Sequence, residues 1–154
     1  MKPIGVISDT HGLLREQVKS RLQGCDLILH AGDVGGPSVL TELRQIAPVI
    51  AVRGNMDRGP WAGQLAEMEY LEIRGWNICV IHDLSRLSLD AAAAGVNVVI
   101  YGHSHRPHLD RKDGILYLNP GSAGPKRFHL PVSMALLQIG PAGIVPTLLE
   151  LQPP

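Results

Sequence analysis

Long apolar runs, blocks of like charge and cysteine motifs are all missing from this 154-residue sequence. Lys plus Arg equals Asp plus Glu, at 14 each, so no basic stripe suggests an extended nucleic-acid footprint or an anionic membrane surface. Aromatic residues make up only 4% of the chain, which leaves little surface for stacking nucleic-acid bases. No stretch is long enough to span a bilayer, and no apolar signal segment precedes the first expected strand. We therefore expect a cytoplasmic protein.

The two cysteines, Cys25 and Cys79, lie far apart in apolar surroundings and form no CxxC pattern. We interpret them as buried structural thiols, with a disulfide or metal role as the alternative. A chain of this length can build one core without disulfides, and we expect a single domain over residues 1–154.

The first half of the chain alternates short apolar runs with amphipathic segments. Strands are expected at Ile4–Ile7, Asp26–His30 and Val49–Val52. Helices are expected over 13–22 and 37–47, where apolar residues recur every three or four positions. Each of the three strands stops where polar, ligand-type residues begin, and this repetition is the strongest structural signal in the sequence.

The second half changes character. Hairpins are expected over 69–81 and 107–118, the second with Asp113-Gly114 as its turn, and a last strand pair over 131–151. An Ala- and Leu-rich helix is expected over 84–95, leading into a buried strand that ends at Ile100. Alternating strands and helices followed by hairpins predict an α/β fold of two stacked β-sheets flanked by α-helices.

Seven polar residues at the ends of the expected strands have side chains that bind metals. They are Asp9, His11, Asp33, Asn55, His82, His103 and His105. Oxygen and imidazole ligands without a thiolate suit Mn²⁺, Fe²⁺, Co²⁺, Ni²⁺ or a catalytic Zn²⁺. Seven ligands are too many for one ion and suit two ions that share a carboxylate.

The motifs that carry these residues resemble, in order, those of the calcineurin-like metallophosphoesterases. They are Ser8-Asp9-Thr10-His11-Gly12, Gly32-Asp33, Gly54-Asn55, His82 and Gly102-His103-Ser104-His105. The resemblance is greatest to the small phosphodiesterase branch called YfcE-like or MJ0936-like. It implies a β-sandwich between helices, in agreement with the pattern of expected strands.

The resemblance also implies which residues hold each ion. Asp9, His11 and His105 would bind one ion, whereas Asn55, His82 and His103 would bind the other, and Asp33 would bridge the two. The expected cofactor is a pair of divalent ions, Mn²⁺ first, with Ni²⁺, Fe²⁺, Co²⁺ or Zn²⁺ as alternatives.

The activity implied is that of a metal-dependent phosphoesterase, a hydrolase that cleaves phosphodiesters or, in second place, phosphomonoesters. The two metals would activate a hydroxide for in-line attack on phosphorus. Asn55 and His103 are the expected catalytic residues, and Asn119, Ser122 and Arg127 are candidates for binding the small phosphate-ester substrate. The sequence leaves open a homo-oligomeric assembly and does not identify the physiological substrate.

Plainer interpretations stand beside these roles. Asp9 and Asp33 also suit helix N-caps, Asn55 a turn, and His82 a hydrogen-bonded core histidine. A different class of function is a non-catalytic protein-binding scaffold of the type of vacuolar protein sorting 29, a retromer subunit with this fold. In that protein some metal-site residues are replaced, whereas all seven positions are present here, which favours the enzyme.

The third motif departs from the pattern of many relatives at Met56, where a proton-donating histidine is common. A thioether cannot donate a proton, so we predict a slow enzyme or one that prefers good leaving groups. Asp57 could either hold a neighbouring ligand in place or cap a following helix.

Overall fold

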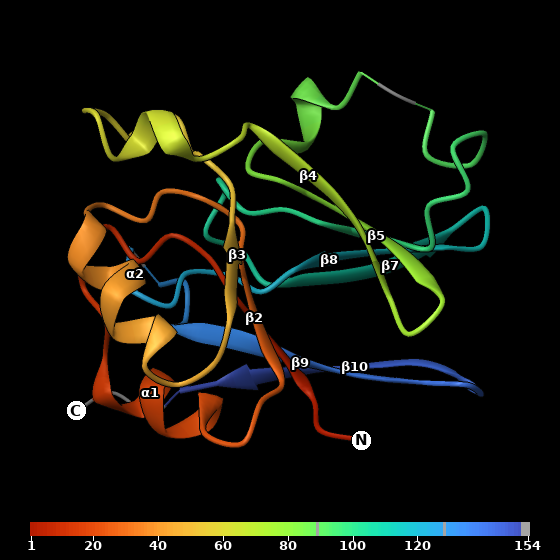
Figure 1. Cartoon of the computed structure of the whole chain (residues 1–154), viewed down its shortest axis with the longest axis horizontal. Coiled ribbons are helices and arrows are strands. Elements are labelled where there is room, and N and C mark those ends of the chain that lie inside the picture. The colour runs from red at the N-terminus through yellow and green to blue at the C-terminus, as the bar shows by residue number, and fades with distance from the viewer. Residues whose placement is uncertain (89, 128, 152–154) are drawn as a thin grey trace.

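The computed structural model describes residues 1–88, 90–127 and 129–151, and it contains two stacked five-stranded β-sheets (Figure 1). The first sheet has the order β10-β9-β1-β2-β3. Its strands are β1 Ile4–Ile7, β2 Leu27–His30, β3 Val49–Ala51, β9 Ser133–Gly140 and β10 Gly143–Glu150. β1, β2 and β3 run parallel, whereas β9 and β10 are antiparallel to their neighbours, so the sheet is mixed.

The second sheet has the order β4-β5-β6-β8-β7 and is also mixed. Its strands are β4 Met68–Ile73, β5 Trp76–Ile81, β6 Val98–Ile100, β7 His108–Lys112 and β8 Ile115–Asn119. β5, β6 and β8 run parallel, so their carboxyl ends meet at one edge. The predicted two-sheet α/β fold is thus confirmed.

The core between the sheets is formed by alternate residues of the central strands. Val6 and Leu29 of the first sheet pack in one fully buried cluster with Val80, Ile100 and Leu118 of the second. Side chains of a strand alternate between its two faces, so the intervening residues point away from this core. The two sheets are therefore joined by apolar packing along their facing surfaces.

Two helices cover the outer face of the first sheet: α1, Glu16–Leu22, and α2, Pro37–Arg44. Val18 and Leu22 of α1 and Leu43 of α2 are fully buried against Ile7 and other strand residues. At Gly5 of β1 an added Cβ would collide with the Leu22 side chain, so the absence of a side chain there lets α1 approach the sheet. The helices are shorter than the expected ranges 13–22 and 37–47.

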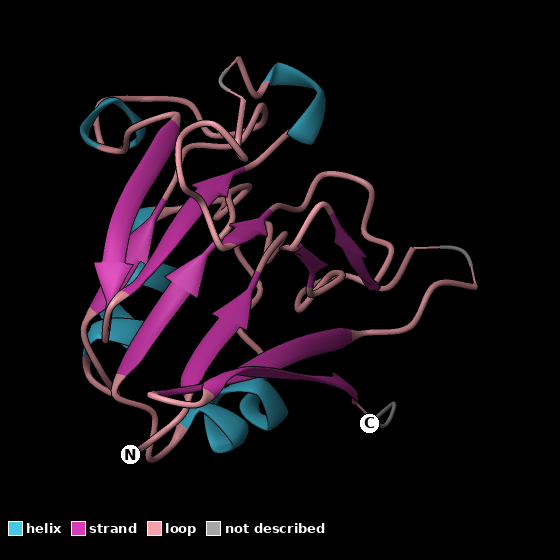
Figure 2. Ribbon diagram, turned by 90° about the vertical axis from the view of Figure 1, so that its right-hand side faces the viewer, coloured by secondary structure: helices cyan, strands magenta, loops and turns pink. Residues whose placement is uncertain are grey.

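The helix expected over 84–95 is wrong. The described part of this segment contains one 3₁₀ turn, η2 Leu84–Arg86, and otherwise consists of turns and loop (Figure 1, green; Figure 2, pink). Residue 89 of the expected helix lies outside the described residues. Asp83 accepts a hydrogen bond from the Ser85 N–H, and Asp90 accepts from two N–H groups just after it. Such side-chain bonds to the backbone compete with a continuous helix. The apolar residues still pack on the second sheet, where Ala91 and Val96 are buried.

Both expected hairpins are present. β4 pairs with β5 across Arg74-Gly75, and β7 pairs with β8 across Asp113-Gly114, with positive φ at both central residues of each turn. Two successive positive φ angles match the tight turn that suits the twist of paired strands. A third hairpin joins β9 to β10.

Cys25 and Cys79 are buried, free thiols, as predicted. Within the described part of the chain, no helix has the length and apolar character needed to cross a membrane.

Candidate metal centre

The loops that follow β1, β2 and β3 lie side by side because the strands are parallel neighbours. The Asp9 N–H donates to the Gly32 carbonyl at 3.0 Å, and the His11 N–H donates to the Asp33 carbonyl at 2.9 Å. The Met56 N–H, in the third loop, donates to the Asp33 carboxylate at 2.8 Å. Backbone hydrogen bonds thus bring the first three motifs to one edge of the first sheet.

The loops that follow β5 and β6 in the second sheet reach the same place. The Gly102 N–H donates to the His82 carbonyl at 3.0 Å, and the His103 N–H donates to the Asp9 carboxylate at 3.2 Å. A Cβ on Gly102 would collide with the Ser8 hydroxyl and lie 2.7 Å from Asp9 Oδ2. Only glycine allows this approach, which places ligand-type residues of both sheets together.

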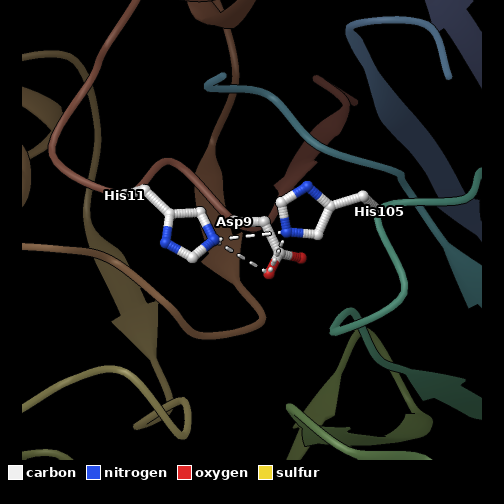
Figure 3. A group of neighbouring side chains, drawn as sticks. All are labelled: Asp9, His11 and His105. Atoms are coloured by element: carbon white, nitrogen blue, oxygen red, sulfur yellow. Dashed lines mark hydrogen bonds and ion pairs between the residues drawn. The ribbon is translucent and has the colours of Figure 1, made fainter. Parts of the chain in front are cut away.

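One group consists of the side chains of Asp9, His11 and His105 (Figure 3). The two imidazoles face the carboxylate oxygen Asp9 Oδ1. Asp9 Oδ1 lies 3.3 Å from His105 Nε2 and 3.7 Å from His11 Nε2. The two imidazole nitrogens are 3.2 Å from each other. The three residues come from distant parts of the chain and point toward one another.

A second group lies beside the first. His82 Nε2 is 3.2 Å from Asp33 Oδ2 and 3.0 Å from Asn55 Oδ1, and His103 Nδ1 is 3.2 Å from the same Asn55 oxygen. Asp33 Oδ2 also lies 3.6 Å from His11 Nε2, so Asp33 faces both groups. All seven candidate ligands therefore converge on one place.

The hydrogen bonding of these residues is incomplete in a way that fits cations. In the described part of the chain, no group donates a hydrogen bond to the buried Asp9 Oδ1. His82 Nδ1 lies 2.7 Å from the Ala31 carbonyl, which can only accept, so Nδ1 carries the proton. Burial opposes protonation of His82, but Asp33 and Asp9 outweigh burial and raise its pKa. When His82 is neutral, its Nε2 presents a lone pair to the Asp33 and Asn55 oxygens. A cation between these acceptors satisfies all of them, and a carbonyl partner on the other nitrogen is typical of metal-binding histidines.

The backbone of the ligand loops is unusual as well. Five candidate ligands have positive φ: Asp9 at 56°, His11 at 47°, Asp33 at 54°, His103 at 74° and His105 at 62°. Residues with a Cβ rarely occupy this left-handed region, and each such conformation costs about 1–3 kcal/mol. Strain of this kind gathers at functional sites, where the surrounding structure maintains it.

The acidic groups are held in the charged state. Burial opposes ionisation of Asp9, but the nearby imidazoles of His105 and His11 outweigh this effect, so the pKa of Asp9 lies well below its ordinary value. Burial likewise raises the pKa of Asp33, but interactions that include the one with His82 lower it by more than burial raises it. The net shift of the Asp33 pKa is downward. Both side chains are therefore anionic acceptors at neutral pH.

The pKa of His11 is raised, mainly by its interaction with the Asp9 carboxylate and against the effect of burial. Arg127 is exposed and near enough that its positive charge opposes this rise. Of the three candidates for substrate binding, Arg127 is thus the one exposed to solvent.

Asn119 and Ser122, the other two candidates, are buried behind the ligand loops. Asn119 Nδ2 donates to the Gly102 carbonyl at 3.1 Å, and Ser122 Oγ donates to the Asp9 carbonyl at 3.2 Å. These contacts make both residues supports of the loops, and a direct substrate contact from either stays a prediction.

His30 and Thr10 connect the first two loops. The Thr10 hydroxyl donates to the Val34 carbonyl at 2.7 Å and therefore accepts from His30 Nε2 at 3.0 Å. His30 Nδ1 accepts from the Gly32 N–H at 3.1 Å, so the ring is neutral. Complete burial lowers the pKa of His30 to about 4, in keeping with this neutral form.

Asp57 is the connection between the second and third loops. Its buried carboxylate accepts from the N–H groups of Val34 at 3.2 Å, Gly35 at 3.0 Å and Gly54 at 2.9 Å. Of the two roles proposed for it, holding a neighbouring ligand is the one that these contacts support. The sequence carried no signal for the number of its partners.

Comparison with known proteins agrees with this arrangement. The family model of the calcineurin-like phosphoesterase superfamily domain matches residues 1–141. A probable metallophosphoesterase of Methanocaldococcus jannaschii, MJ0623, is 40% identical over 146 residues, which cover 86% of this chain and 74% of that protein.

Two solved structures show the same fold. The phosphoesterase YfcE of Escherichia coli is 27% identical with a TM-score of 0.70, and 88% of each chain is covered. Chaetomium thermophilum Vps29 has a TM-score of 0.78 at 19% identity, covering 99% of this chain and 98% of that one, which shows the fold alone. The family match and the sequence identity to metallophosphoesterases confirm the resemblance: this chain belongs to the calcineurin-like phosphoesterase superfamily.

Proposed function

We propose that this protein is a metal-dependent phosphoesterase that hydrolyses a small phosphodiester. Asp9, His11 and His105 would hold one divalent ion, and Asn55, His82 and His103 a second, with Asp33 shared between them. Mn²⁺ is the first choice because the ligands are carboxylate, amide and imidazole groups without a thiolate.

The observation that carries the proposal is the position of Asp33, whose Oδ2 lies 3.6 Å from His11 Nε2 in one group and 3.2 Å from His82 Nε2 in the other. One carboxylate oxygen between two groups of nitrogen ligands is an arrangement in which a pair of ions could share a ligand. With two carboxylates against two divalent ions, about two positive charges remain to attract an anion such as a phosphate ester. When bound, such ions lower the pKa of a coordinated water and neutralise the phosphate oxygens.

Asn55 and His103 are the two candidate ligands with exposed side chains, which supports their role in contacting the substrate. Met56 follows Asn55 and is 56% exposed, yet its thioether has no proton to give. We therefore propose that this enzyme works best on esters whose leaving group departs without protonation.

The choice of a phosphodiester as substrate rests on the similarity to a protein named a phosphodiesterase. The phosphodiesterase YfcE of E. coli is 29% identical over 112 residues. A phosphomonoester is the second choice.

The test is hydrolysis of bis-p-nitrophenyl phosphate by purified protein with added Mn²⁺. We expect hydrolysis that EDTA abolishes and binding of two equivalents of Mn²⁺ per chain. The variant Asp33→Asn should lose both the hydrolysis and the binding of two equivalents. Asp110→Asn is the control, since Asp110 is an exposed residue of β7 and should change neither result. No hydrolysis of phosphodiesters or phosphomonoesters at full Mn²⁺ occupancy would refute the proposal.

That same inert, metal-loaded result would favour the other class, a protein-binding scaffold. The likeness to Vps29 covers nearly the whole chain, but at 19% identity it extends to the fold alone. The complete set of seven ligand-type residues supports the enzyme.

A further inference from the structure

A pocket of about 270 Å³ opens beside Asn55 and His82, next to the candidate metal centre. Its wall includes five charged residues, Arg53, Asp57, Glu67, Asp83 and Arg86, and one large apolar side chain, Ile81. The Asp57 carboxylate is already occupied by three backbone N–H groups. The volume lies just below the range of about 300–1,000 Å³ that is usual for drug-sized ligands. The pocket therefore has room for one small group attached to a phosphate held at the metal centre.

The charges in the wall are not equally available. Arg86 Nε lies 2.8 Å from Glu67 Oε1, so these two residues neutralise each other. Arg53 is half-buried and donates from Nη1 to the Leu65 carbonyl at 3.0 Å, and no carboxylate of the described chain is within ion-pair distance of it. Its remaining N–H groups are free to bind a ligand oxygen.

Asp83 supplies the opposite chemistry. Its Oδ1 accepts from the N–H and hydroxyl of Ser85, at 3.0 and 2.7 Å, whereas its Oδ2 accepts no hydrogen bond within the described residues. The pocket thus offers a free donor group from Arg53 and a free acceptor from Asp83.

This combination favours a neutral group that can both donate and accept. An anionic group would be attracted by Arg53 but repelled by Asp83, and a cationic group the reverse, so a single charge gains little. An apolar group would meet one aliphatic side chain among polar ones. The aromatic ring in the wall, His82, is buried and faces Asp33 and Asn55 of the candidate metal centre, so it offers little surface for stacking a nucleobase. A hydroxyl group, by contrast, both donates and accepts, and a group with neighbouring hydroxyls can use Arg53 and Asp83 together.

We infer that the pocket binds a small polyol, of the glycerol or monosaccharide type, esterified to the phosphate of the substrate. Arg53 donates to one hydroxyl and Asp83 accepts from another, so these two residues determine specificity. The inference rests on the proposed function and narrows it to phosphodiesters of polyols.

The test uses two chromogenic diesters with the same leaving group, glyceryl p-nitrophenyl phosphate and ethyl p-nitrophenyl phosphate. A hydrogen bond to a charged group changes affinity by roughly tenfold or more, so we expect kcat/KM to favour the glyceryl ester by about 100-fold. Arg53→Met and Asp83→Asn should each lower this preference by about tenfold. The matched controls are Arg44→Met and Asp90→Asn, at exposed positions outside the pocket, which should keep it.

The outcomes separate this inference from the proposed function. If both esters are hydrolysed with kcat/KM values within threefold of each other, the inference is wrong and the phosphodiesterase stands. If neither ester is hydrolysed, the polyol pocket is tested by calorimetric binding of glycerol 1-phosphate and ethyl phosphate to the Mn²⁺-loaded protein. Equal dissociation constants there, or no weakening in Arg53→Met, would overturn the polyol pocket.

Discussion

Replacing Asp57 by alanine should destabilise the fold, although this residue lies in the loop after β3 and belongs to no helix or strand. Its carboxylate accepts three backbone hydrogen bonds, and the residue is only 6% exposed. Gly35 is exposed, so water can replace the carboxylate there, whereas the N–H groups of Val34 and Gly54 are on buried residues. Two buried bonds to a charged group, at about 1.5–2 kcal/mol each, give an expected loss of about 3–4 kcal/mol.

The measurement is urea unfolding followed by circular dichroism, in EDTA so that metal binding does not contribute. Asp90→Ala is the control, because Asp90 also accepts from two backbone N–H groups but is exposed, and it should cost at most about 1 kcal/mol. Because Asp57 joins the loops of Asp33 and Asn55, its variant should also bind Mn²⁺ more weakly. A free energy of unfolding within 1 kcal/mol of the unaltered protein would show that these hydrogen bonds do not matter as argued.

Three further predictions follow from other features. Gly102→Ala should weaken Mn²⁺ binding at least tenfold in calorimetry, because its Cβ would displace the Ser8 hydroxyl. The control Gly63→Ala, where the added Cβ meets no atom within 4 Å, should bind Mn²⁺ as before. Equal weakening in the two variants would contradict this prediction. Burial lowers the pKa of His30 to about 4 from 6.5, so the unfolded chain takes up a proton between these values that the folded chain does not. The free energy of unfolding should therefore fall by about 3 kcal/mol from pH 6.5 to 4 through this group. His30→Gln should flatten that slope, and unchanged slopes in urea titrations would refute the assignment. Met56→His should raise kcat for phenyl esters relative to p-nitrophenyl esters, by up to the ~10²–10⁴-fold typical of general acids, and an unchanged ratio would count against a missing proton donor.

The sequence predicts the parts of the fold that depend on local pattern. The strand ends carry ligand-type residues, and in a parallel sheet such ends share one edge, so the convergence of Asp9, Asp33 and Asn55 could be anticipated. Asp113-Gly114 identified its hairpin because this pair suits a turn with two positive φ angles. The role of the seven residues as metal ligands stays a prediction.

Other features depend on contacts between distant parts of the chain. The Ala-rich segment 84–95 has helical composition, but bonds from Asp83 and Asp90 to the backbone and packing on the second sheet override it. The positive φ of His11 had no sequence signal, since histidine does not mark the left-handed region as glycine does. The burial of Asn119 and its bond to the Gly102 carbonyl cannot be seen in the sequence, and its contact with the substrate stays a prediction.

Four candidate ligands follow strands of the first sheet and three follow strands of the second. Cations at this edge would therefore crosslink the two layers at one end, in addition to the apolar packing that joins them along their length. Chelation would remove the crosslink and keep the packing, so amide exchange should quicken in the loops while the central strands stay protected. The supply of metal would then govern how readily proteases attack this end of the molecule, besides governing turnover.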